Sequence, residues 1–160
     1  MRARLKKFVL GGLAVLVVVP SAAAAEEWVR YRSTGDKPAR SVFLIDRDTI
    51  EKDRSEPLTV RMAILSESGL RWVPQVITEM VINCAEGEGR ITRGEARDEQ
   101  GELLRAVEGD AYGGALNDNP QGNEILGIVC EGSWPATAVS FPNLSLTQIY
   151  SEAFRRTEGP

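Results

Sequence analysis

"WVPQVITEMVINC", residues 72–84, is the longest stretch of the chain with the alternation of a β-strand. Its apolar side chains recur at every second position and end on Cys84. Successive side chains of a strand point to opposite faces, so Glu79 and Asn83 are expected toward water and Cys84 toward the core. The high content of β-branched residues favours a strand over a helix. We therefore expect a central strand that delivers a cysteine to the core.

Cys84 and Cys130 are the only cysteines, and they lie 46 positions apart. An even cysteine count in an exported chain is typical of a disulfide, and closing a loop of this size contributes about 4 kcal/mol of stability. The alternatives are two free thiols or a metal pair. Two cysteines in a chain without histidine do not complete a zinc site. The sequence therefore predicts a Cys84–Cys130 disulfide.

Residues 1–25 have the organisation of a secretory signal peptide. Four basic residues precede twelve uncharged ones, Phe8–Val19, and small residues follow up to Ala25. The alternative is a membrane anchor, but the apolar stretch is shorter than the ~20 residues that a spanning helix needs. We expect cleavage after Ala25 and export to the periplasm or the outer cell surface.

The expected mature chain begins at Glu26 and is long enough for one domain with a hydrophobic core. Loss of the four basic leader residues changes the net charge from −4 to −8. An acidic domain of this kind repels nucleic acid and anionic lipid, so neither is an expected partner. No later apolar stretch is long enough to cross a membrane.

Three further segments before residue 72 are expected to form strands. Residues 26–32 carry Trp28, β-branched Val29 and Tyr31, and residues 41–46 are short and apolar. Residues 58–65 alternate, with Leu58, Val60, Met62 and Ile64 on one face. The polar stretch 47–57 offers Thr49–Ile50 as one possible strand contact. The sequence thus predicts several short strands before the central one.

A β-hairpin and a helix are expected after Cys84. Residues 90–97 and 102–107 are extended segments joined by a polar connection that ends in glycine. Residues 109–119 are rich in glycine, asparagine and aspartate and are expected to form a loop. Asn119 and Pro120 then suit the cap and first position of a helix that ends at Gly132, although Gly122 and Gly127 weaken it by roughly 1 kcal/mol each.

The C-terminal region, residues 133–160, contains a second helix. Ser145 and Gln148 form a capping box. The residues that follow with helical spacing are apolar: Leu146, Ile149, Tyr150, Ala153 and Phe154. This stripe is expected to pack on the sheet; the alternative is an interface with a partner or a membrane.

The chain has no histidine, which removes the commonest general base and the preferred transition-metal ligand. The two lysines outside the leader, Lys37 and Lys52, lie in polar segments, and no nucleophile-elbow or phosphate-loop motif occurs. We therefore expect no enzyme activity and no cofactor. A calcium site is the alternative reading of five oxygen-bearing residues that are otherwise expected in a capped loop: Asp110, Asn117, Asp118, Asn119 and Glu124.

Four arginines concentrate on the expected hairpin: Arg90, Arg93, Arg97 and Arg105. On an acidic domain they form a local positive feature that suits an acidic protein or a polyanion. The alternative is a solvated strand pair in which these arginines alternate with glutamates. Such charges also protect a sheet edge from aggregation.

The order of these features resembles the surface-adhesin protein E family of Gram-negative bacteria. The resemblance covers most of residues 26–130 and rests on short motifs in a fixed order: Trp28, Phe43-Leu44-Ile45-Asp46, Asp48-Thr49-Ile50, Asn83-Cys84, the turn Asp98-Glu99-Gln100-Gly101, and the helix Glu124–Cys130. It implies an α+β fold in which an antiparallel sheet carries a helix pinned by Cys84–Cys130, followed by a C-terminal extension from residue 133.

The resemblance also implies a non-enzymatic envelope protein, since family members in pathogens bind host matrix and plasma proteins. The expected function is therefore an adhesin-like exported protein that binds a protein or polyanion through Arg90, Arg93, Arg97 and Arg105. The alternative is a structural or assembly factor of the periplasm that uses its C-terminal helix as an interface.

Overall fold

The computed structural model describes residues 26–52, 57–67 and 73–155; the expected leader lies outside them. These residues form seven strands and three helices. The strands are β1 (Glu27–Thr34), β2 (Ser41–Asp46), β3 (Leu58–Ser66), β4 (Gln75–Asn83), β5 (Glu88–Arg97), β6 (Leu103–Ala115) and β7 (Val139–Pro142). The helices are α1 (Arg47–Lys52), α2 (Pro120–Glu131) and α3 (Leu146–Arg155). None of these helices is long and apolar enough to cross a bilayer.

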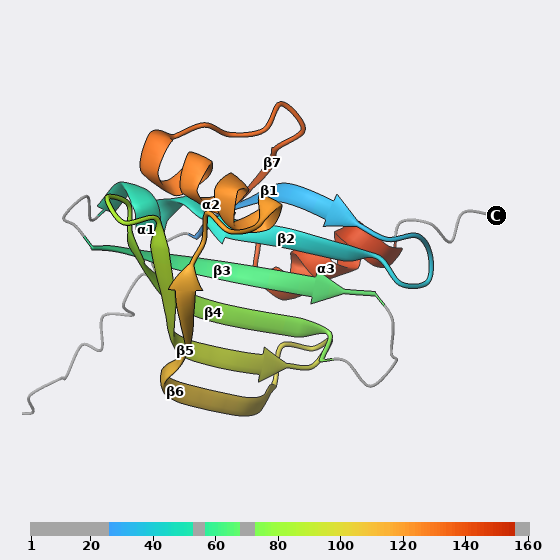
Figure 1. Ribbon diagram of the computed structural model, residues 1–160. Helices are drawn as coiled ribbons and strands as arrows, with labels where there is room; N and C mark the ends of the chain where they lie inside the picture. The colour runs from blue at the N-terminus through green and yellow to red at the C-terminus, as the bar shows by residue number, and fades with distance from the viewer. Residues whose placement is uncertain (1–25, 53–56, 68–72, 156–160) are drawn as a thin grey trace, which may run out of the picture.

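All seven strands belong to one antiparallel sheet of order β6-β5-β4-β3-β2-β1-β7 (Figure 1). Strands β1 to β6 follow one another as a meander, because each connection is short enough to return the chain to the neighbouring position. Strand β7 then pairs with the outer side of β1. The α+β fold class and the antiparallel sheet are as expected.

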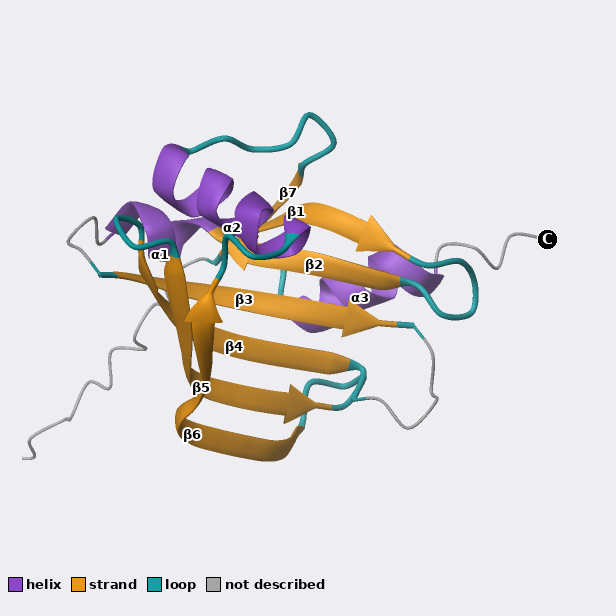
Figure 2. Ribbon diagram, in the orientation of Figure 1, coloured by secondary structure: helices purple, strands orange, loops and turns teal. Residues whose placement is uncertain are grey.

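Helices cover both faces of the sheet (Figure 2). Helix α3 packs on one face, here called the α3 face, against Trp28, Val42, Leu44, Ala63, Leu65 and Ile77. Helix α2 packs on the opposite face, the α2 face, against Tyr31, Ile45, Leu58, Val60, Met62 and Ile82. Because both faces are covered over β1 to β3, residues of both parities are buried there. The core is thus two clusters separated by the sheet.

Helices α2 and α3 begin at the caps that the sequence predicts, and α2 ends at the predicted glycine. The Asn119 side chain accepts a hydrogen bond from the Gly122 amide at 2.8 Å, and Gly132 ends α2 with φ 72°. At α3, the Gln148 amide donates to Ser145 Oγ at 3.3 Å and the Ser145 amide donates to Gln148 Oε1 at 2.8 Å. The apolar stripe of α3 is buried in the core, which confirms the expected packing on the sheet.

Thr49 and Ile50, considered as a possible strand contact, lie in helix α1, and Thr49 Oγ1 accepts a hydrogen bond from the Arg61 amide of β3 at 3.1 Å. Buried Asp46 ends β2 and begins the helix: its carboxylate accepts from the Asp48 amide at 3.2 Å, and its carbonyl accepts from Thr49 Oγ1 at 2.7 Å. Asp46 thus caps a short helix. This helix has too few apolar residues to show a helical pattern in the sequence.

The expected loop at residues 109–119 is wrong in its first half, since β6 continues to Ala115. The long strand β5 offers a partner: Glu88 pairs with Ala115 and Ile91 with Tyr112. A bulge absorbs the extra residues of β6 at Gly109, where φ is 106°. Pairing with β5 therefore outweighs the poor strand propensity of this glycine-rich segment.

Candidate functional site

The four arginines of the hairpin lie on opposite faces of the sheet. Arg93 is opposite Glu79 and Arg90 is opposite Val81, and both partners share the parity of core residue Ile77 on the α3 face. Arg90 and Arg93 reach the same face because the register shifts between Ile91 and Arg93. Arg97 shares that face, whereas Arg105, opposite Ala96, lies on the α2 face. The structure therefore separates Arg105 from the other three.

Glu95 lies between Arg93 and Arg97 and binds both. Arg97 donates to Glu95 Oε2 from Nε at 3.0 Å and from Nη2 at 2.7 Å, and Arg93 Nη2 lies 2.8 Å from Oε1. Arg97 also donates to the Gly101 carbonyl at 2.9 Å. The hydrogen bonds from Arg97 lower the pKa of Glu95, against the effect of its burial. Two of the predicted ligand-binding arginines are thus engaged with a neighbouring carboxylate.

Charges of alternating sign cross the α3 face in one row. Arg61 on β3, Glu79 on β4, Arg93 on β5 and Glu108 on β6 lie directly opposite one another in register. Opposite charges on adjacent strands stabilise a sheet, typically by 0.2–1 kcal/mol per pair in order of magnitude. This row balances positive with negative charge, which weakens any local attraction for a polyanion.

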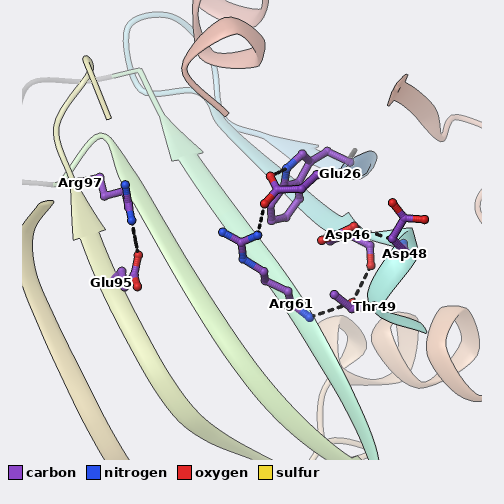
Figure 3. A network of polar contacts seen from close by, with 8 residues as sticks. Glu26, Asp46, Asp48, Thr49, Arg61, Glu95 and Arg97 are labelled. Carbon is purple, nitrogen blue, oxygen red and sulfur yellow. Dashed lines mark hydrogen bonds and ion pairs between the residues drawn. The ribbon is translucent and has the colours of Figure 1, made fainter. Parts of the chain in front are cut away.

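A polar network ties the start of β1 to β3 and α1 (Figure 3). Glu26 accepts hydrogen bonds from Trp28 Nε1 at 2.9 Å and from Arg61, whose guanidinium lies 5.4 Å from the centre of the Trp28 ring. Burial and the nearby Glu26 raise the pKa of Asp46, while Arg61 opposes them. These groups are thus engaged in contacts within the domain.

The disulfide joins the end of β4 to the last turn of α2, with an S–S distance of 2.05 Å between Cys84 and Cys130. The predicted pairing is confirmed, and with it a helix pinned to the sheet. The bond borders a pocket of about 350 Å³. There Arg47 lies 5.2 Å from the centre of the Trp134 ring and forms an ion pair with Glu27 at 2.8 Å.

Three of the five oxygen-bearing residues considered for calcium serve other contacts. Asn119 caps α2, the Asn117 carbonyl accepts from Asn123 at 3.2 Å, and Glu124 forms an ion pair with Arg32 at 3.3 Å. The side chain of Asp110 lies outside the described part of the chain. Among the described residues, no group of three or more acidic, cysteine or histidine side chains is arranged to hold a metal ion.

An apolar hollow on the α2 face of β4 to β6 is the feature that sequence reasoning missed. It has a volume of about 430 Å³, within the range of roughly 300–1,000 Å³ that is usual for ligand pockets. Its lining includes Val76, Ile91, Gly94, Ala96, Arg105 and Val107. Val107 of this lining is exposed by 41%, and β6 also exposes Leu103 by 54% and Leu104 by 58%. In the sequence, Val107 and Gly94 inside β5 were the signals that could have indicated this hollow.

Comparisons with protein-family models, curated proteins and solved structures find no match. The resemblance to the surface-adhesin protein E family therefore stays a prediction from the sequence motifs.

Proposed function

We propose that this chain is an exported, non-enzymatic binding protein that holds a partner protein at the β6 edge of its sheet. One observation carries the proposal. Strand β6 is a 13-residue edge strand that exposes Leu103, Leu104 and Val107, whereas the opposite edge is the four-residue β7, which ends in Pro142. Folded proteins usually protect edge strands, so a long and partly apolar one is typical of a binding surface.

A protein partner fits this surface better than a polyanion does. Arg93 and Arg97 both bind Glu95, and the row across the α3 face alternates in sign. The full chain has a net charge of −4, and four of its basic residues lie in the leader. The chain outside the leader therefore carries a net charge of −8. Long-range repulsion therefore opposes a polyanion, and apolar contacts do not suffer from it.

Export and a non-enzymatic role complete the proposal. The leader-like residues 1–25 and the Cys84–Cys130 bond both suit an oxidising compartment outside the cytoplasm. The absence of histidine from the sequence leaves few options for acid–base chemistry. An adhesin-like role in a Gram-negative envelope rests on the sequence resemblance. The rival assembly role would need another surface, because the apolar stripe of α3 is buried.

Photo-crosslinking in the exporting cell tests this function. A photoreactive residue at Leu104 on β6 is compared with one at Val139 on β7, which is also exposed, by 38%. We expect a discrete protein adduct from position 104 and none of that mass from position 139. The same adduct from both positions, or none from either, contradicts the proposal. Cell fractionation with protease shaving then decides between periplasm and outer surface.

A further inference from the structure

The outer side of β6 offers unpaired backbone groups. In the described part of the chain, β5 is the strand that pairs with β6, and β6 ends the sheet. Alternate amide and carbonyl groups along an edge strand point away from its neighbour and are free to bind another extended chain. Addition of a strand to such an edge is a common mode of peptide recognition.

The apolar hollow lies on the α2 face immediately inside this edge. Val107 of β6 is directly opposite Gly94 of β5, and Gly94 is opposite Thr78 of β4. Because Gly94 has no side chain, it leaves a gap between Val107 and the floor of the hollow. A long apolar side chain from a strand beside β6 can reach over Val107 toward Gly94, since adjacent strands are about 4.8 Å apart.

The packing of the described residues gives no reason for Gly94. A Cβ built at this position meets none of their atoms within 4 Å, and its φ is not in the left-handed region. The two register shifts of the β5–β6 pair lie elsewhere, between Ile91 and Arg93 and between Ala96 and Arg97. A glycine inside a strand that forms neither a bulge nor a tight contact often marks the close approach of a ligand or another backbone.

Arg105 gives the hollow a positive rim. It is exposed, it is opposite Ala96 on the α2 face, and it forms no hydrogen bond or ion pair with the residues that the structure describes. The nearest acidic residue of β6, Glu108, is opposite Arg93 and so faces the other side. An occupant that supplies a carboxylate at this rim would complete the charge balance of the α2 face.

From these observations we infer that β6 binds an extended segment of a partner protein by strand addition. The inference rests on the proposed function and specifies its mode. An apolar side chain of the segment enters the hollow beside Gly94, and an acidic side chain two residues away lies beside Arg105, since residues i and i+2 of a strand share one face. In a second copy of this chain paired antiparallel through β6, the acidic residue whose side chain the structure describes on that strand, Glu108, points to the α3 face and does not lie beside Arg105.

The test uses an unbiased library of displayed nine-residue peptides and the full exported chain. We expect enriched peptides with apolar and acidic residues two positions apart. The best one, synthesised, should lose at least tenfold in affinity to Gly94→Ile, which fills the hollow, and to Arg105→Glu, which reverses the rim charge. Exchange of its acidic residue for lysine should restore binding to Arg105→Glu. Arg93→Glu, an exposed reversal on the opposite face, is the matched control and should change affinity less than twofold.

Several outcomes would overturn the inference. One is that the library yields no peptides enriched on the parent protein relative to the Gly94→Ile variant. Another is that the enriched peptides bind as helices. A third is that none of the β6-edge variants changes the affinity for the selected peptide. Binding of palmitate that Gly94→Ile abolishes, without any selected peptide, would make the hollow a site for amphiphiles instead. Thermal melts check that Gly94→Ile stays folded, as its open surroundings indicate. A crosslink at position 104 without selected peptides would leave the binding function standing and refute strand addition alone.

Discussion

Gly122 and Gly127 stand five residues apart in α2 and meet opposite surroundings. A Cβ on Gly122 would lie 1.9 Å from the backbone oxygen of Leu116, whereas a Cβ on Gly127 would lie 4.0 Å from Ser133 Cβ. Both glycines lower the helix propensity of α2 equally. Only Gly122 is required, because the chain before the helix passes against its first turn.

The two glycines should therefore respond in opposite directions to alanine. We expect Gly127→Ala to raise the free energy of unfolding by about 1 kcal/mol through helix propensity. Gly122→Ala should lower it by about 1–3 kcal/mol or more, because backbone atoms must move. Urea unfolding of both variants measures this difference, and a stabilising Gly122→Ala would contradict the close approach of Leu116.

Asp46 determines a pH dependence whose sign follows from its raised pKa. Burial and Glu26 raise the pKa above its value in the unfolded chain, while Arg61 and the Asp48 amide oppose the shift. The native state therefore binds this proton more tightly than the unfolded state does. The stabilisation from protonated Asp46 is complete below about pH 4, the pKa of free aspartate, and is lost as the pH rises through the raised value.

Asp46→Asn removes this titration and keeps an oxygen that accepts from the Asp48 amide. We expect the melting temperature of the variant, relative to the parent, to be higher at pH 7 than at pH 4. Other titrating groups cancel in this difference, since both proteins contain them. A relative melting temperature that falls between pH 4 and pH 7 would mean that attraction to Arg61 outweighs burial.

At the scale of elements, α3 shows how a local pattern and a distant surface combine. Phe154 is buried, its ring centre lies 5.0 Å from that of Tyr150, and the Arg40 guanidinium lies 5.4 Å from it. Arg40 itself donates two hydrogen bonds of 2.6 Å to Glu67. The helix thus closes the α3 face over β1 to β4 and is part of the core.

Truncation of the stripe should destabilise the domain. We expect Phe154→Ala to cost roughly 3 kcal/mol or more, as buried aromatic truncations do. Ser151→Ala in the same helix, outside the buried stripe, is the control and should change stability by less than about 0.5 kcal/mol. If thermal melts of Phe154→Ala match those of the parent, the stripe faces a partner and the assembly role gains support.

The disulfide ties α2 to the end of β4. Cys84→Ser together with Cys130→Ser should lower the free energy of unfolding by about 4 kcal/mol, given the size of the closed loop. Denaturant unfolding of the double variant measures this loss. Non-reducing peptide mapping of protein from an oxidising compartment should show the linked pair, and free thiols at both sites would refute it.

At the scale of the whole molecule, charge and sheet topology together decide what the protein attracts. The α3 face of β3 to β6 carries arginines and glutamates in alternation, while the α2 face beside β6 is apolar with Arg105 at its rim. The first surface has the features of a solvated sheet stabilised by ion pairs. The second has an open edge and an apolar hollow, so the two faces of one hairpin differ in character.

The domain should not be retained by heparin at physiological salt. Its net negative charge and the binding of Arg93 and Arg97 to Glu95 both oppose a polyanion. A heparin column run at low and at physiological ionic strength measures this. Retention that salt weakens, and that charge reversal at Arg90, Arg93 and Arg97 abolishes, would instead support the arginines as a polyanion site.

Much of the fold could be predicted from short stretches of the sequence. The caps of α2 and α3, the stripe of α3, and strands β1 to β5 depend on residues within a few positions of one another, so periodicity and capping reveal them. The pairing of Cys84 with Cys130 followed from a count of two. Helix α1, strand β7 and the second half of β6 were missed, because a buried carboxylate, an available sheet edge and a long partner strand stabilise them.

The candidate site was the part that no local pattern contained. Alternation assigns residues to faces only while the register is unbroken, and the bulge beside Thr92 brings Arg90 and Arg93 to one side, whereas Arg105 lies on the other. Glu95 was visible in the sequence, but its contacts with Arg93 and Arg97 depend on side-chain placement. That β6 ends the sheet is a property of strand order, which forms through contacts far apart in the chain. The hollow exists because pairing puts Gly94 opposite Val107, and no stretch of sequence contains both strands and their register.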